Sequence, residues 1–173
     1  ATTEIYALSL ALSPDALAED LISPWLLPPV YARIKEGQSF LAELRPQVTS
    51  LFLRFTGLDY DGDDLAGEKL DAFICWVATV LGRHDGNLLQ LTVGDKGSYL
   101  YASFGAPVAH EDNAVRAVAA TLDLRAKATS FEGIDEVQIG LSAGTMWTGA
   151  CGGAGHRTYG VMGNETNMAA RLM

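Results

Sequence analysis

The hydrophobic pattern separates an N-terminal lead-in from a more regular region. Residues 1–22 show no clear period, and Pro24, Pro28 and Pro29 interrupt the stretch that follows. Apolar residues then recur at helical spacing over residues 30–44, and Pro46 comes directly afterwards. This pattern predicts a lead-in helix that ends before Pro46, because proline cannot continue a helix. We therefore divide the chain into a lead-in or linker with a helix, residues 1–45, and a domain at residues 46–173.

From residue 48 onward, short apolar runs alternate with longer amphipathic segments. The short runs predict strands at 48–55, 87–93, 98–104, 137–143, 146–150 and 159–162. The amphipathic segments predict helices at 65–82, 111–128 and 164–173, the last with Asn164 as N-cap. The turn residues 94–97 indicate a hairpin between two of the strands, and residues 137–150 indicate a second strand pair.

This order of elements predicts the fold class. Strand, helix, strand, strand, helix, strand is the ferredoxin-like order, with additional elements at the end. We expect an α+β domain in which helices pack on one face of an antiparallel sheet.

Composition and charge narrow the function. The chain has 173 residues, of which 49% are hydrophobic and 19% are charged, so it can bury a core of one domain. Its net charge of −9 disfavours non-specific binding to nucleic acid and to anionic membranes. Because the net negative charge repels a polyphosphate ligand, local hydrogen-bond donors or a metal ion would have to hold it.

Cysteine content and hydropathy favour a cytoplasmic location. Cys75 and Cys151 are too few for a disulfide framework, and Cys75 lies in an apolar helical stretch that predicts a small core residue. We see no secretory signal pattern and no run of the roughly 20 apolar residues that a membrane-spanning helix needs.

Two motifs resemble ligand sites but do not satisfy their rules. The acidic loop at residues 59–64 has a glycine two places too early for an EF-hand, and Leu70 stands where the last carboxylate belongs. The glycine-rich run at residues 149–155 is not followed by Lys-Ser/Thr, so it is no P-loop. We interpret the first as a solvated acidic turn and the second as a hairpin tip.

The last predicted helix carries a more informative pair. Asn167 and Arg171 are four residues apart, which places an amide and a guanidinium on one helix face. An amide can orient a sugar, and a guanidinium can grip a phosphate. Such a pair is common on protein surfaces, so the spacing alone is weak evidence for a nucleotide site.

Several ordered motifs resemble the class III adenylyl and guanylyl cyclase catalytic domain. Residues 159–172, Tyr-Gly-Val-Met-Gly-Asn-Glu-Thr-Asn-Met-Ala-Ala-Arg-Leu, are similar to the family signature Val-Ile-Gly-x-x-Val-Asn-x-Ala-Ala-Arg-Leu. Further likenesses, in family order, lie at residues 42–52, 104–107, 111–118 and 139–144. The Asp-Lys-Gly sequence at 95–97 resembles the second, C2-like, half of soluble adenylyl cyclase.

The resemblance implies a shared active site. In this family two domains pair head to tail, as hetero- or homodimers. One half holds two Mg²⁺ or Mn²⁺ ions, and the other brings residues for the base, the ribose and the phosphate. The 3′-hydroxyl of ATP attacks the α-phosphate, which yields cyclic AMP and pyrophosphate. The family core continues beyond the last predicted helix, so we expect the domain to be incomplete at its C-terminal end and to expose a sheet edge or an apolar face.

By position in the motifs, Asn167 matches the ribose asparagine and Arg171 the transition-state arginine. The base-recognising lysine falls at Gln90 or Leu91, and the second base contact falls at Gly160.

The metal positions depart further from the family. Arg54 stands where the first metal-binding aspartate is expected, and only Asp95 lies near the second position. Because a cation repels metal ions, we expect this chain alone to hold no metal pair.

Three hypotheses follow. The first is a C2-like half of an adenylyl cyclase that needs ATP and a metal-bearing partner half, and that is inactive alone. The second is a pseudo-cyclase that serves dimerisation or senses a regulatory ligand. The third is an unrelated ferredoxin-like binding domain, which a different strand order would reveal.

Overall fold

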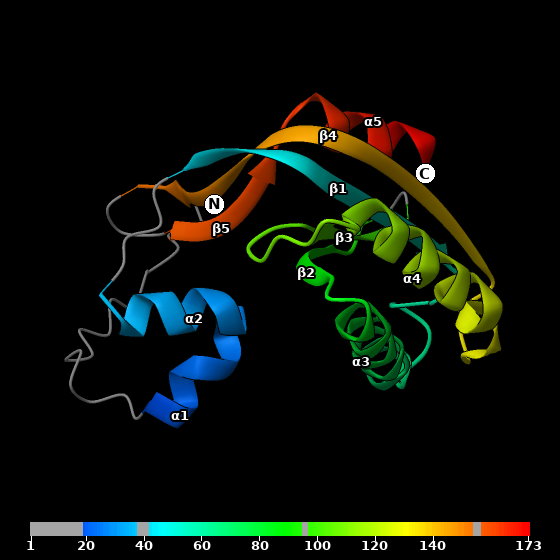
Figure 1. Ribbon diagram of the computed structural model, residues 1–173. Helices are drawn as coiled ribbons and strands as arrows, with labels where there is room; N and C mark the ends of the chain where they lie inside the picture. Colours follow the sequence, from blue (N-terminus) through cyan, green and yellow to red (C-terminus); the bar gives the residue numbers. More distant parts are fainter. Residues whose placement is uncertain (1–18, 38–41, 95–96, 154–156) are drawn as a thin grey trace, which may run out of the picture. The chain divides into compact units, whose positions relative to one another are not determined.

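The computed structural model describes residues 19–37, 42–94, 97–153 and 157–173 (Figure 1). The chain divides into two compact units, residues 1–38 and residues 39–173. Asp95 lies outside the described residues.

The N-terminal unit contains short helices. These are α1 (Glu19–Ile22), the 3-10 helix η2 (Ser23–Trp25) and α2 (Pro28–Lys35). The prediction of one helix over residues 30–44 is wrong at its C-terminal end, because α2 stops at Lys35 and strand β1 already begins at Glu43. Gly37, with φ of +72°, follows the helix and adopts a left-handed conformation that helices rarely continue through.

Strand β1 (Glu43–Thr56) is longer than predicted and contains Pro46. The register to its neighbour β4 shifts between Arg45 and Val48, which is a β-bulge, and Gln47 within it has φ of +57°. A bulge leaves ladder positions unpaired, so a proline without an N–H is accepted there. Pro46 therefore interrupts a strand and does not end a helix.

The remaining elements of the second unit form one antiparallel sheet with three helices. The helices are α3 (Ala66–Arg83), α4 (Asn113–Lys127), followed by the 3-10 turn η3 (Ala128–Ser130), and α5 (Asn164–Leu172). The other strands are β2 (Asn87–Thr92), β3 (Ser98–Phe104), β4 (Glu136–Gly152) and β5 (Arg157–Met162). Their order in the sheet is β2-β3-β1-β4-β5, which is the ferredoxin-like order with β5 added at one edge. The predicted α+β class and antiparallel sheet are confirmed.

Strand β4 replaces the predicted pair at 137–143 and 146–150. It is one continuous strand of 17 residues, and Gly144 inside it pairs with Val48 of β1. The Gly144-Thr145 sequence imitates a turn, but the hydrogen-bonded ladder to β1 passes through it. Beyond Thr145 the same strand also pairs with β5.

The helices cover both faces of the sheet, which corrects the expectation of one covered face. Helices α3 and α4 lie on one face and α5 on the other (Figure 1). The core under α3 and α4 is a cluster around Leu51, Phe55 and Phe73. The face under α5, called here the α5 face, has a smaller core of Val48, Phe52, Tyr101, Ala106, Met146, Val161 and Ala169. Because strand side chains alternate, even-numbered residues of β1 from Val48 onward point to the α5 face.

Two local predictions are wrong in detail. Cys75 is exposed, because α3 turns Phe73, Val77, Val80 and Leu81 inward. Asn164 is the first residue of α5, while Gly163 occupies the N-cap, so no side chain caps the start of this helix.

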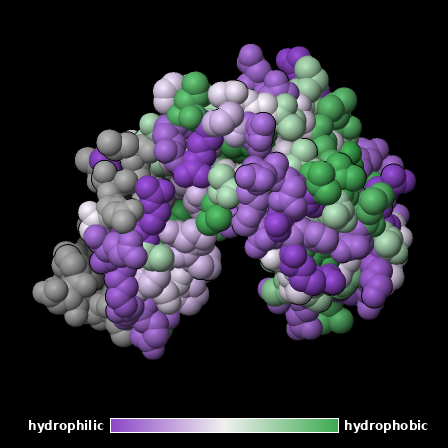
Figure 2. All heavy atoms as spheres, viewed as in Figure 1, coloured by the Kyte–Doolittle hydropathy of each residue, from purple (hydrophilic) through white to green (hydrophobic). Residues whose placement is uncertain are grey.

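An apolar surface runs along β4 and α4 (Figure 2). Val115, Val118 and Leu122 of α4 are at least half exposed, and Val137, Ile139 and Leu141 of β4 are half-buried. In the described part of the chain, residues 136–146 of β4 pair with β1 on one side and with no strand on the other. This combination of open edge and apolar strip is suited to contact with another polypeptide segment.

Helix α5 crosses β4 directly over Gly140. A Cβ atom on this glycine would lie 2.7 Å from the backbone nitrogen of Met173 and would clash with the carbonyl oxygen of Ala169. Neither neighbour is a flexible side-chain end, so the helix can come this close only because position 140 has no side chain.

We expect Gly140→Ala to destabilise the domain by at least about 1–3 kcal/mol, the usual cost of overpacking a core. Urea unfolding measures this change. The matched control is Gly82→Ala in α3, where an added Cβ meets nothing within 4 Å. There alanine should stabilise by about 0.5–1 kcal/mol through helix propensity. Equal effects of the two substitutions would contradict the role given to Gly140.

Candidate functional site

Helix α5 presents the predicted pair to solvent. Asn167 and Arg171 are both exposed, whereas Ala169 between them is fully buried against the sheet. The predicted helix and the shared outer face are thus present. Among the described residues, neither side chain makes a hydrogen bond or an ion pair, so the amide and the guanidinium are available to an external ligand or partner.

Two apolar residues accompany this pair. Met168 and Leu172 are 46% and 60% exposed on the same helix. They too are four residues apart, so they form a second row beside Asn167 and Arg171. The exposed side of α5 therefore combines a polar row with an apolar row, a composition typical of a surface that another molecule covers.

Polar contacts hold α5 on the sheet. Glu165, in the first turn, accepts a short hydrogen bond from the hydroxyl of Ser142 on β4. The carboxylate is also well placed for the positive end of the helix dipole.

A buried hydroxyl cluster, formed by Ser50, Tyr101 and Thr166, lies beneath the start of α5. The Tyr101 hydroxyl donates to the carbonyl oxygen of Val161 on β5 at 2.9 Å. The Ser50 hydroxyl lies 3.3 Å from both the Tyr101 and the Thr166 hydroxyls, and the last two are 3.5 Å apart. Met146 Sδ is within 3.6 Å of Ser50 and Thr166. The cluster thus connects β1, β3, β4 and β5 with α5.

Sequence reasoning did not identify this cluster. The available signal was Thr166, which stands where the cyclase signature has valine. Ser50 and Tyr101 read simply as strand residues, and only the antiparallel pairing of β1 with β3 brings them together.

Arg54 lies at the other end of the α5 face. It follows Ser50 and Phe52 by strand alternation and is half-buried. Its guanidinium covers Gly97 in the turn between β2 and β3, where an added Cβ would lie 3.0 Å from Arg54 Nε. Arg54 therefore lies beside Gly97, whereas the other predicted metal position, Asp95, lies outside the described residues.

An open pocket of about 700 Å³ adjoins Arg54. Its lining includes Gly94, Gly97 and the acidic loop residues Asp59 and Asp61. Asp59 is already engaged, because its carboxylate accepts hydrogen bonds from the backbone N–H groups of Asp61 and Gly62. This is the solvated acidic turn that the sequence predicts.

The residues of this pocket do not fit a metal pair. Arg54 is a cation whose guanidinium has no lone pair to donate to a metal ion. Within residues 19–37, 42–94, 97–153 and 157–173, no group of three or more His, Cys, Asp or Glu side chains is arranged to hold a metal ion.

The predicted base contacts lie on the two edge strands. Gln90 on β2 is exposed, and its amide donates to the hydroxyl of Thr92 at 3.1 Å. Gly160 on β5 is half-buried, and a Cβ there would lie 3.2 Å from Cys151 Sγ. With β3, β1 and β4 between them in the sheet order, the ladder does not bring these two positions together. Gly160 is instead close in sequence to the start of α5.

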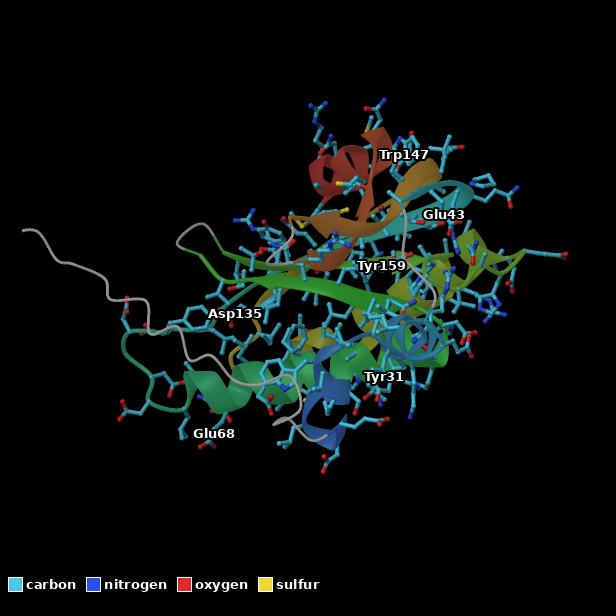
Figure 3. The ribbon with its side chains drawn as sticks, turned by 90° about the vertical axis from the view of Figure 1, so that its left-hand side faces the viewer. Tyr31, Glu43, Glu68, Asp135, Trp147 and Tyr159 are labelled. Carbon is cyan, nitrogen blue, oxygen red and sulfur yellow. The ribbon has the colours of Figure 1, made fainter. Side chains whose placement is uncertain are left out.

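An exposed apolar row crosses strands β1, β4 and β5. Leu44 pairs with Trp147, and Trp147 pairs with Met162, so three half-exposed apolar side chains stand in a row across the strands. Figure 3 labels Trp147 on β4, Glu43 at the start of β1 and Tyr159 on β5.

Comparisons with known proteins agree with this geometry. No family model matches the chain. Human adenylate cyclase type 10 is 27% identical over 169 residues, which is 96% of this chain and 10% of that protein. The rat adenylate cyclase type 10 is 28% identical over 140 residues, 80% of this chain and 9% of that protein. The chain thus spans about a tenth of the length of the curated relatives it matches.

Solved structures show the same architecture. The guanylate cyclase domain of RhGC from Catenaria anguillulae, solved in complex with GTP, superposes with a TM-score of 0.65 at 23% identity, covering 75% of this chain and 72% of that one. The adenylyl cyclase CyaB from P. aeruginosa gives 0.62 at 21% identity, covering 76% and 72%. A bacterial light-regulated adenylyl cyclase gives 0.69 at 16% identity, covering 88% and 47%.

This is the fold of a class III cyclase catalytic domain. The resemblance seen in the motifs is confirmed at the level of the fold, because the solved structures that superpose on this chain are cyclase domains. No helix in the described part of the chain is long and apolar enough to cross a membrane.

Burial raises the pKa of the Tyr101 hydroxyl above its ordinary value of 10.0. The folded state then keeps the Tyr101 proton at a pH where the unfolded state has lost it. Tyr101 should therefore make its full contribution to the free energy of unfolding below about pH 10. We expect this contribution to decrease as the pH rises above that value.

Chemical denaturation between pH 8 and pH 11 tests this expectation. Tyr101→Phe should flatten the alkaline decline, whereas Tyr60→Phe, at a tyrosine that is 42% exposed, should leave it unchanged. An unaltered decline in the Tyr101 variant would contradict the assignment.

Proposed function

We propose that this chain is a C2-like half-domain of an adenylyl cyclase, with residues 46–173 as the cyclase domain, acting in the cytoplasm. It contributes nucleotide-binding residues to a site shared with a second cyclase domain, which supplies two Mg²⁺ or Mn²⁺ ions. The observation that carries this proposal is a difference between the residues proposed to bind nucleotide and the residue at the proposed metal position. Asn167 and Arg171 are both exposed on α5, while Arg54, at the position proposed for a metal ligand, packs against Gly97.

Asn167 and Arg171 have distinct roles in this proposal. The Asn167 amide orients the ribose of ATP. The Arg171 guanidinium donates to oxygens of the α-phosphate, where negative charge develops as the 3′-hydroxyl attacks. The metal ions of the partner half would activate the hydroxyl and clamp the triphosphate.

The electrostatics of the chain make Arg171 important. With a net charge of −9, the domain repels a triphosphate at long range, so binding depends on local cations. Arg171 is exposed at the end of α5, where a cation also interacts favourably with the helix dipole. Met168 and Leu172 beside it supply apolar surface for the partner domain to cover.

Adenine recognition would rest on Gln90 and the region of Gly160. The Gln90 amide can hydrogen-bond a purine edge, although it now donates to Thr92. Gly160 offers no side chain, and the neighbouring Cys151 fills the space beside it. The preference for ATP over GTP is supported mainly by similarity to adenylate cyclase type 10.

A second candidate is a pseudo-cyclase that binds a regulatory ligand or only pairs with another domain. Arg54 favours this candidate, because its guanidinium packs over Gly97 and places a positive charge where a metal-binding carboxylate is proposed for an active half.

The deciding measurement is cyclic AMP production from ATP with Mn²⁺, for this chain alone and for its mixture with a metal-competent cyclase half. We expect activity only in the mixture. Activity of the chain alone would refute the assignment of Arg54, and an inactive mixture with a demonstrated mixed dimer would favour the pseudo-cyclase.

Within the active mixture, Arg171→Ala should lower kcat by about 10²–10³-fold, as loss of one donor to developing charge does elsewhere. Asn167→Ala should also lower turnover. Arg125→Ala, at another exposed arginine near a helix C-terminus, is the matched control and should have no effect. Unchanged turnover in the Arg171 variant would remove that residue from the mechanism.

A further inference from the structure

The start of α5 lacks the local features that usually fix a helix. Gly163 at the N-cap has no side chain, and the backbone N–H of Asn167 is 3.5 Å from the Gly163 carbonyl oxygen, at the long end for a hydrogen bond. An N-cap side chain would normally satisfy these first amides and define the direction of the helix. The position of α5 must therefore come from tertiary contacts.

The hydroxyl cluster supplies such a contact. Thr166 is in the first turn of α5, and its hydroxyl meets Ser50, which is fully buried, and Tyr101, which is 8% exposed. Tyr101 gives its proton to the Val161 carbonyl, so its oxygen can accept from Ser50, whose oxygen in turn can accept from Thr166. This order uses each proton once and forms a continuous chain from α5 to β5.

The two ends of this chain are adjacent to proposed substrate positions. Thr166 directly precedes Asn167, and Val161 directly follows Gly160. The cluster thus links the position of the ribose contact with the strand that carries the base contact. Its three members come from β1, β3 and α5, and Tyr101 donates to β5, so the link is attached to the strands of the sheet and not to a loop.

Thr166 also differs from the cyclase signature, which has valine at this position. Threonine and valine have nearly the same shape, and they differ in one hydroxyl group. In a site lined only by apolar groups, that hydroxyl would cost stability. Here it finds two hydroxyl partners and Met146 Sδ, so the added polar group is satisfied.

We propose that Thr166 is a positioning residue, which acts through the buried Ser50 and Tyr101 hydroxyls to set the orientation of α5 and hence of Asn167 and Arg171. This role rests on the proposed function for its catalytic consequence, but the ordering of α5 can be measured without any activity.

The test compares Thr166→Val, Thr166→Ser and wild type in the full chain. By hydrogen exchange, we expect the amide protons of α5 to exchange about 2- to 10-fold faster in Thr166→Val, the range expected for loss of one net hydrogen bond. Thr166→Ser keeps the hydroxyl and should restore the protection. Ser103→Ala removes another fully buried hydroxyl, which donates to the Ala106 carbonyl oxygen and has no hydrogen bond to α5 among the described residues, so it should leave α5 exchange unchanged.

The catalytic measurement uses the same variants paired with the metal-competent half. Thr166→Val should lower kcat about 10-fold through misplacement of the reacting groups, with KM for ATP within about twofold, and Thr166→Ser should recover most of it. Unchanged α5 exchange in Thr166→Val would overturn the proposal whatever the activity. If Ser103→Ala increased the exchange of α5 amide protons as much as Thr166→Val does, the effect would reflect general stability of the domain. That result would also overturn the proposal. A wild-type mixture without activity would refute the proposed function, while the exchange result would still decide the role of Thr166.

Discussion

The direct contact between α5 and β4 at Gly140 is the constraint on which the candidate site depends. A helix normally keeps its axis several ångströms from a sheet, because side chains separate the two. At Gly140 the backbone of α5 occupies the space of a missing side chain. In the same packing, Thr166 in the first turn lies within reach of Ser50 and Tyr101, and Asn167 and Arg171 are exposed. Without that contact, α5 would lie farther from the sheet and Thr166 could not reach the other two hydroxyl groups.

Both apolar packing and hydrogen bonds hold α5 on the sheet. The apolar core beneath α5 is small, and it includes residues such as Met146 and Ala169. The larger core lies under α3 and α4 and stabilises the sheet. A helix that rests on a small core gains orientation mainly from directional hydrogen bonds, which distinguish one helix position from another better than apolar contacts do. The shared-site model depends on such orientation, because the ligand would be held between two domains.

Two arginines, Arg171 on α5 and Arg54 on β1, place positive charge on this side of the sheet. Arg171 belongs to the nucleotide-binding half of the proposed mechanism, and a cation there suits a phosphate. Arg54 is a second cation, and its guanidinium packs against Gly97 in the turn between β2 and β3. One domain thus offers two cationic positions and no described metal cluster. A partner with complementary carboxylates would complete the arrangement.

The sequence by itself determined the class of fold and the placement of Asn167 and Arg171 on one exposed helix face. Strand and helix periodicity, the hairpin at 94–97 and the Asn167–Arg171 spacing were sufficient, because each reflects local geometry or a motif that is contiguous in the chain. Local patterns failed where long-range pairing overrides them. Pro46 and Gly144 look like element ends, yet the ladder between β1 and β4 continues past both.

Only the tertiary structure decided on which face α5 lies, that Gly140 is its point of contact, and that Ser50, Tyr101 and Thr166 form one cluster. These residues are 51 and 65 positions apart along the chain. No local period carries that information, because it arises only when antiparallel register and helix packing bring the three hydroxyls together.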